Sequence, residues 1–251
     1  MSELGKLFDI YSLNARVKPA FLLVFPVVIA LFTLFEPSRS WGGAAITFII
    51  SFGIINFAAN QMSTKGNILQ DKLFLKWGGS PTTIILRHSD HRLDTHTKSR
   101  YMSIMERLIS NFSAVSYEQE VNDSCKADEM YRTAGNYMKE HTRDTKKYPL
   151  VFKELITYGF SRNIKAFKWL GFTISTLSLA VSGFIIWYKH IKDNNAPIVD
   201  LLFNIPFENT ALILSLVLMI FLWLFLVTEK WVEVRSFSYA KALFAACEKQ
   251  A

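Results

Sequence analysis

The chain has 251 residues, of which 51% are hydrophobic and 20% are charged, and its formal net charge is +7. That length allows one or two domains, and the two cysteines, Cys125 and Cys247, lack the spacing of a metal site. The net positive charge fits attraction to anionic lipid better than binding of nucleic acid, because it is spread unevenly along the chain, as in membrane proteins.

Charged residues are absent from four windows of the chain: 19–35, 40–64, 169–188 and 209–228. A bilayer core of about 30 Å needs roughly 20 helical residues. Three of the windows meet that length, and the first is slightly short. The sequence therefore predicts four membrane-spanning helices arranged as two hairpins.

Positive charge is unevenly divided between the segments that join these windows. Residues 60–168 hold 18 Lys and Arg against 12 Asp and Glu, whereas the other two connectors hold only Arg39, Lys189 and Lys192. Because basic segments stay on the cytoplasmic side, we expect both termini and residues 60–168 in the cytoplasm. The predicted fold is mainly α, a multi-pass inner-membrane protein with four transmembrane helices and an inserted, mostly helical cytoplasmic domain.

The predicted organisation has four parts. Residues 1–59 form a short interfacial helix and the first transmembrane hairpin, residues 60–164 form the cytoplasmic domain, residues 165–228 form the second hairpin, and residues 229–251 form an amphipathic cytoplasmic tail. The interfacial helix is expected over residues 3–17, where apolar residues recur at helical spacing.

The two spans of the first hairpin are interrupted differently. Pro19 starts the first span, where its missing N–H costs nothing, and Pro26 is expected to kink the middle of that span. The second span is predicted from Ala44 to Ala59.

Residues 60–164 contain several short helical patterns. A helix near residues 68–74 should break at Gly78-Gly79, and Ser80-Pro81 has the pattern of an N-cap followed by proline at the first helical position. A strand over residues 82–86 competes with that helix, because most of these residues are β-branched. Apolar spacing further predicts three helices, at 98–115, 124–141 and 149–158, with Gly159 ending the last.

The second hairpin is predicted over residues 165–188 and 210–227, followed by a helical extension lying against the membrane or the cytoplasmic domain. The irregular connector expected between these spans carries Asn194, Asn195 and Pro197. Small residues on one face of the third span predict a helix–helix contact. That face consists of Gly171, Ser175, Ser178 and Ser182.

A concentration of basic residues near a glycine pair predicts an anion site in the cytoplasmic domain. Arginine side chains grip phosphate with two parallel hydrogen bonds, lysine adds charge, and glycine backbones can offer N–H donors. The predicted ligand-binding residues are Lys76, Gly78, Gly79, Arg87, Arg92 and Arg100. A second basic group is assigned to contact with lipid or ligand, and it comprises Arg143, Lys146, Lys147 and Arg162.

The same stretch also supports a metal hypothesis. His88 and His91 would share a face if the stretch were helical, with Asp94 one turn further on, and His and Asp are common ligands of transition metals. The spacing matches no known metal motif, and a solvated polar connector between two helices is the simpler explanation. We predict no cofactor.

Two spans, a basic domain and two further spans resemble the layout of four-transmembrane effector proteins of bacterial anti-phage systems. The segments that carry the resemblance beyond the layout are 76–83 (Lys-Trp-Gly-Gly-Ser-Pro-Thr-Thr), 87–90 and 158–163. The resemblance implies a cytoplasmic sensor, often for a nucleotide, joined to spans that assemble and damage the inner membrane.

The first functional hypothesis is therefore a non-enzymatic effector. It would bind the lipid bilayer, assemble as a homo-oligomer and respond to an anionic ligand such as a nucleotide. Two alternatives stay open: a membrane-bound metal-dependent enzyme that uses residues 88–96, and a membrane anchor for a soluble partner protein.

Overall fold

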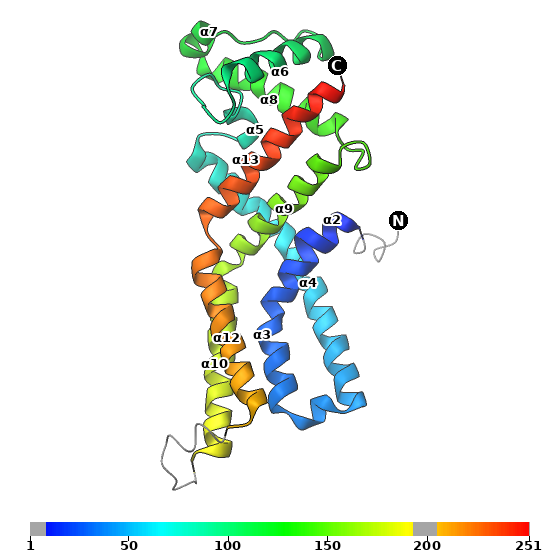
Figure 1. The fold of residues 1–251 in the computed structure, drawn as a ribbon, viewed down its shortest axis with the longest axis vertical. Coiled ribbons are helices and arrows are strands. Elements are labelled where there is room, and N and C mark those ends of the chain that lie inside the picture. Colours follow the sequence, from blue (N-terminus) through cyan, green and yellow to red (C-terminus); the bar gives the residue numbers. More distant parts are fainter. Residues whose placement is uncertain (1–8, 193–204, 251) are drawn as a thin grey trace. The chain divides into compact units, whose positions relative to one another are not determined.

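The computed structural model describes residues 9–192 and 205–250, and all regular secondary structure among them is helical (Figure 1). The elements are α2 (Ile10–Ser12), η1 (Leu13–Val17), α3 (Lys18–Leu34), η2 (Glu36–Arg39), α4 (Trp41–Trp77), α5 (Pro81–Ile84), α6 (Thr95–Leu108), α7 (Tyr117–Asn122), α8 (Ser124–His141), α9 (Pro149–Ala166), α10 (Lys168–His190), α12 (Phe207–Phe221), η3 (Leu222–Leu226), α13 (Glu229–Ala245) and η4 (Ala246–Lys249). η1 and η3 are π-helical, and η2 and η4 are 3₁₀-helical. The start of the expected interfacial helix and residues 194–197 of the expected connector lie outside the described residues.

The chain forms two compact units. Unit 1 comprises Met1–Asn67 and Phe160–Glu229, and unit 2 comprises Ile68–Gly159 and Lys230–Ala251. The first boundary falls inside α4 and the second inside α9, rather than after residues 59 and 164. The tail after residue 229 belongs to unit 2 rather than forming a separate part.

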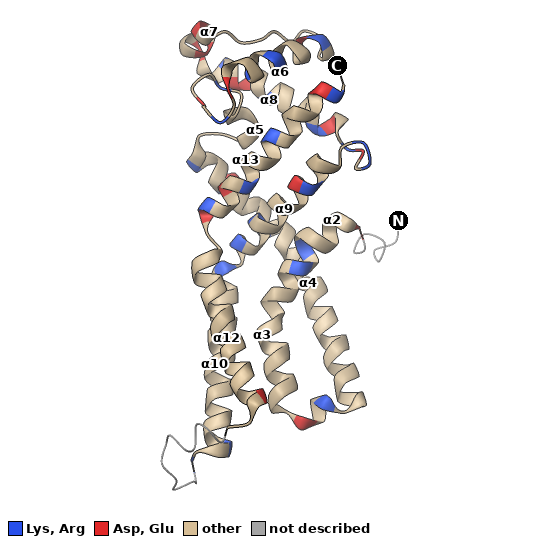
Figure 2. Cartoon of the chain, in the orientation of Figure 1, with Lys and Arg blue, Asp and Glu red and all other residues tan. Residues whose placement is uncertain are grey.

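Four helices in the described residues are long and apolar enough to cross a membrane, as predicted. They are Ile10–Leu34, Trp41–Ile84 (which includes α4), Lys168–His190 and Phe207–Leu226. Figure 2 shows that charged residues lie at the ends of α3, α10 and α12 and not along their lengths. Pro26 lies inside α3, which continues past it to Leu34.

Packing within unit 1 centres on α10, which contacts both α3 and α12. Leu34 of α3, Ile186 of α10, and Leu212 and Leu216 of α12 are buried together in one cluster. At the same end of these helices, Arg39 in η2 pairs with Glu208 in α12 at 2.9 Å.

The span within α4 is packed much less than the others. Only 11% of its most hydrophobic 18-residue window is buried, against 33% for Ile10–Leu34 and 22% for each of the other two. Several of its large side chains, among them Phe48, Ile49 and Phe57, are more than half exposed. One side of unit 1 therefore presents a bare apolar helix.

The core of unit 2 is assembled from helices that lie far apart in the sequence. Its largest fully buried side chains include Met105 from α6, Tyr131 and Met138 from α8, and Phe244 from α13. α13 packs against this core along Phe237, Ala240, Leu243 and Phe244. The helical extension predicted after the fourth span therefore lies against the residues of the predicted cytoplasmic domain.

Residues 80–86 start a short helix and not a strand. Ser80 accepts a hydrogen bond from the Thr83 N–H at 3.3 Å and Pro81 is the first residue of α5, as the capping pattern predicted. The strand alternative is wrong, because the capped turn satisfies the local backbone and buries Pro81, Thr82, Thr83 and Ile84.

Two predicted helix ends are wrong. The helix expected to reach Val115 ends at Leu108, and Asn111 adopts a positive φ of 60°. The apolar spacing was misleading because Phe112 and Val115 still pack on the core from non-helical backbone. Gly159 does not end α9, which continues to Ala166, since a glycine in a helix lowers its stability without stopping it.

Candidate functional site

Arg87 is held inside unit 2 by an acidic partner. Its Nε and Nη2 donate to the two carboxylate oxygens of Asp128 in α8 at 2.8 and 2.6 Å, and Nη2 also donates to the Gly78 carbonyl at 2.6 Å. The bond to Asp128 raises the pKa of Arg87, against an opposing effect of burial. A phosphate would need the same two parallel N–H donors of the guanidinium, and Asp128 already accepts from them.

The other two arginines of the predicted anion site are also paired within unit 2. Arg92 pairs with Asp90 and with Glu233 of α13, and its guanidinium lies 3.7 Å from the centre of the Phe237 ring. Arg100 pairs with Glu248 of η4 at 2.8 Å. The three arginines therefore serve three different contacts and do not converge on one ligand.

Gly78 and Gly79 end α4 rather than form an anion cradle. Their φ angles are 79° and 148°, values that favour glycine, and their N–H groups donate to the carbonyls of Leu75 and Phe74. Both donors that the sequence offered to a phosphate are therefore used in capping the helix. Lys76 is exposed in the last turn of that helix.

The second basic group is divided between the two units. Arg143, Lys146 and Lys147 are exposed in the turn after α8, where Asp144 accepts hydrogen bonds from the N–H groups of the two lysines. Those bonds lower the pKa of Asp144. Arg162 is instead buried in unit 1, and its Nε donates to Asn163.

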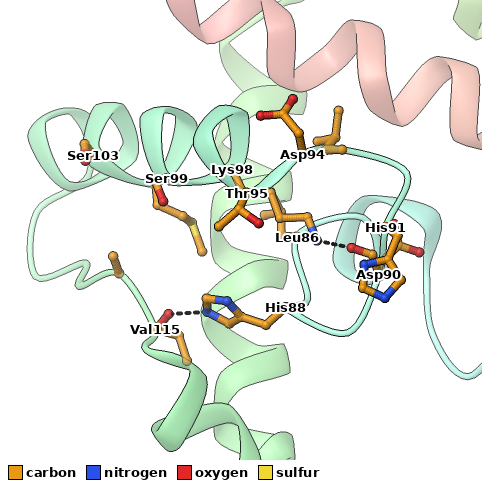
Figure 3. A pocket seen from close by; sticks show the side chains of 13 residues that line it. Leu86, His88, Asp90, His91, Asp94, Thr95, Lys98, Ser99, Ser103 and Val115 are labelled. Atoms are coloured by element: carbon orange, nitrogen blue, oxygen red, sulfur yellow. Dashed lines mark hydrogen bonds between the residues drawn. The ribbon is translucent and has the colours of Figure 1, made fainter.

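A cavity of about 470 Å³ in unit 2 lies beside the start of α6 (Figure 3). Hydroxyl groups of Thr95, Ser99 and Ser103 follow one another along the helix at four-residue spacing, and His88 lies across from them. Leu86, Leu93, Met102, Ala114 and Val115 supply the apolar part of the wall.

Lys98 closes one side of this cavity from a buried position. Its ammonium group donates to the carbonyl oxygens of Arg87 and Asp90 and so holds together the loop between them. Burial lowers the pKa of Lys98. Sequence reasoning did not predict this role, because lysine side chains are mostly exposed.

The residues of the metal hypothesis have separate structural tasks. His88 bonds the Val115 carbonyl through Nε2 at 2.8 Å, His91 is exposed, and Asp94 caps α6 by accepting from the Thr97 N–H at 2.9 Å. Bonds from Thr97 lower the pKa of Asp94. Within residues 9–192 and 205–250, no three His, Cys, Asp or Glu side chains are grouped as metal ligands, so the geometry gives the hypothesis no ligand set.

A carboxylate that sequence reasoning missed joins the cavity loop to α7 and α8. Glu120 Oε2 accepts from the His88 N–H at 2.9 Å and from the Tyr131 hydroxyl at 2.6 Å. Burial and this carboxylate both raise the pKa of Tyr131. Glu120 therefore ties the backbone at His88 to the side chain of Tyr131 in α8.

The small-residue face of α10 is used within the chain. Gly171, Ser175 and Ser182 are buried and Ser178 is half-buried. A Cβ atom at Gly171 would lie 2.2 Å from the Trp223 ring, so only glycine permits that contact between α10 and η3.

No protein-family model, curated protein or solved structure matches this chain. Its function is therefore inferred from its own residues and geometry.

Proposed function

We propose that this chain is an inner-membrane effector whose copies assemble through their spans and perturb or gate the membrane. Unit 2 would lie in the cytoplasm with both termini and would receive the controlling signal. The anti-phage role that the layout resembles belongs to the same proposal.

The observation that carries the proposal is the bare span of α4. Helices in a bilayer associate by packing, and small residues permit the closest approach. Gly53 lies in the middle of this span, and a Cβ atom added there would meet nothing within 4 Å. A cavity of about 340 Å³ between α3 and α4, lined by side chains such as Phe25 and Phe48, further reduces the contact of α4 with its own chain. A second copy supplies the packing that the chain itself does not.

The cavity beside α6 is the proposed entry point for a signal in unit 2. It combines hydroxyl groups with two histidine rings and an apolar wall, which is the usual composition of a small-molecule site. Arg87, Arg92 and Arg100 are paired within unit 2, so this cavity is the proposed signal site. Charged groups of both signs line the cavity, with Asp90 and Asp94 beside Lys98, so a ligand with hydroxyl or amide groups fits it.

The assembly can be tested by filling the open space at Gly53. Gly53→Leu should leave the isolated chain folded, because its Cβ meets no neighbour, but should prevent close approach of another copy. The measurement is the oligomer size of purified protein in lipid nanodiscs, together with the membrane potential of cells during induced expression. Smaller oligomers and a lost depolarisation are expected.

Gly183→Leu is the matched control, since Gly183 on α10 is equally open. Unchanged oligomer size in Gly53→Leu, or an equal loss in both variants, would contradict assembly through α4. Depolarisation that requires a co-purifying soluble protein would instead support the membrane-anchor alternative.

A further inference from the structure

Two of the four candidate spans contain a five-residue π-helical segment at one end. η1 (Leu13–Val17) directly precedes α3, and η3 (Leu222–Leu226) directly follows α12. A π turn accommodates one residue more than an α-helical turn, and such turns are found disproportionately at functional sites.

In each segment the central carbonyl is bonded by a side chain from another helix. Asn163 Nδ2 donates to the Ala15 carbonyl at 2.6 Å, and Lys168 Nζ donates to the Leu224 carbonyl at 2.8 Å. Ala15 and Leu224 are each the third of the five π-helical residues. Because a side chain that enters the backbone hydrogen-bond ladder distorts a helix, both bonds favour the π geometry.

The two donors lie on either side of the break between α9 and α10. Asn163 is fully buried, and Arg162 Nε donates to its side-chain oxygen at 3.3 Å. Gly66 of α4 approaches so closely that a Cβ atom there would lie 2.0 Å from the same oxygen. Asn163 is therefore held in one orientation by neighbours from two helices, with its amide directed at η1.

We propose that this junction is a latch, in which Asn163 and Lys168 keep η1 and η3 in the π conformation. Loss of either bond lets the segment convert to α-helix, which is narrower and longer by the rise of one residue. Successive residues of an α-helix are separated by about 100° and 1.5 Å, so the attached span turns by about that amount. Each side chain of α12 then takes the place of the residue before it.

The latch lies close to the point where the chain passes from unit 2 into unit 1, between Gly159 and Phe160. A change received in unit 2 would reach Asn163 along the continuous helix α9. The role of the latch in gating rests on the proposed function. The coupling of the two hydrogen bonds to rotation of the spans does not rest on it.

The rotation can be measured with a spin label on α12. Val217 is 48% exposed and the neighbouring Leu216 is fully buried, so rotation carries a label at Val217→Cys from the lipid into the bundle. Lys168→Met removes the Nζ donor, and loss of a charge-assisted bond should shift the equilibrium about tenfold. The label should then lose its accessibility to oxygen dissolved in the lipid, in full-length protein carrying Cys125→Ser.

Three controls make the result specific. Lys168→Arg keeps a donor and should restore the accessibility of the label. Lys189→Met removes the other α10 lysine that bonds a backbone carbonyl, that of Leu34, and should have no effect. Deleting Phe225 removes the extra residue of η3, so Lys168→Met should no longer move the label.

An unchanged label in Lys168→Met, or an equal change in Lys189→Met, overturns the latch. If Lys168→Met does not fold, Lys168→Gln replaces it. A label that still moves on Lys168→Gln in protein lacking Phe225 then overturns the latch as well. Wild-type protein that does not depolarise membranes would remove the proposed function and leave the labelling result standing.

Discussion

At the scale of single residues, Arg87, Arg92 and Arg100 each form an ion pair within unit 2. Arg87 is the strongest of them, because both members of its pair with Asp128 are about three-quarters buried and the geometry is bidentate. Arg100 and Glu248 are about half exposed, where solvent and salt weaken an ion pair. Arginine substitutions should therefore act mainly on folding.

Arg87→Met is expected to destabilise unit 2 by about 2 kcal/mol, because it leaves Asp128 and the Gly78 carbonyl without their donor. In a chain of this size that corresponds to a fall of roughly 5 °C in the melting temperature, measurable by thermal unfolding in detergent. Arg100→Met is the matched control and should cost at most about 0.5 kcal/mol. Equal melting temperatures for wild type and Arg87→Met would show that Arg87 is not a tie.

At the scale of elements, α13 and η4 are the part of unit 2 that joins the fourth span to the core. Phe244 and Cys247 are fully buried there, while Cys125 at the start of α8 is exposed. Burial raises the pKa of the Cys247 thiol from 9.0 to about 12. The Cys247 thiol is therefore neutral and shielded while the tail is docked, so its reactivity reports whether the tail is docked.

Thiol labelling at pH 8 should modify Cys125 rapidly and leave Cys247 unmodified in the native protein. Phe244→Ala should make Cys247 reactive, since removing a buried phenylalanine side chain costs about 3–5 kcal/mol. Val234→Ala on the exposed side of α13 is the control and should leave Cys247 protected. Mass spectrometry of the intact chain counts the labels.

The raised pKa of Cys247 also predicts how docking depends on pH. The thiol of an undocked tail ionises near pH 9 and that of a docked tail near pH 12. The contribution of Cys247 to the free energy of docking is therefore complete below pH 9 and is lost as pH rises from 9 to 12. Labelling of Cys247 that is equally fast at pH 8 with and without Phe244→Ala would contradict tail docking.

At the scale of the whole molecule, the placement of charge sets the expected orientation in the membrane. Three of the 28 Lys and Arg residues lie in the connectors of the two hairpins, and the rest lie in the N-terminal segment, residues 60–168 and the tail. Translocating those basic segments is opposed by the positive-inside rule. Both ends of the chain should therefore face the cytoplasm.

Reporter fusions after Val115 and after Ala251 should both show cytoplasmic activity, and a fusion after Ser38 should show the opposite side. A reporter that is active only on translocation, paired with one active only in the cytoplasm, distinguishes the two. A translocated signal from either of the first two positions would reject this topology.

The sequence by itself determined the features that depend on neighbouring residues. Runs of about 20 uncharged residues are sufficient to specify apolar helices, and the cap at Ser80-Pro81 and the break at Gly78-Gly79 are local backbone chemistry. The tertiary structure alone decided which partners the charged residues meet. Arg87 and Asp128 are 41 residues apart and Arg92 and Glu233 are 141 apart, and no local spacing encodes such pairs. A free cluster of arginines and a set of internally paired arginines have the same local sequence, and only the packing of α8 and α13 against residues 78–100 distinguishes them.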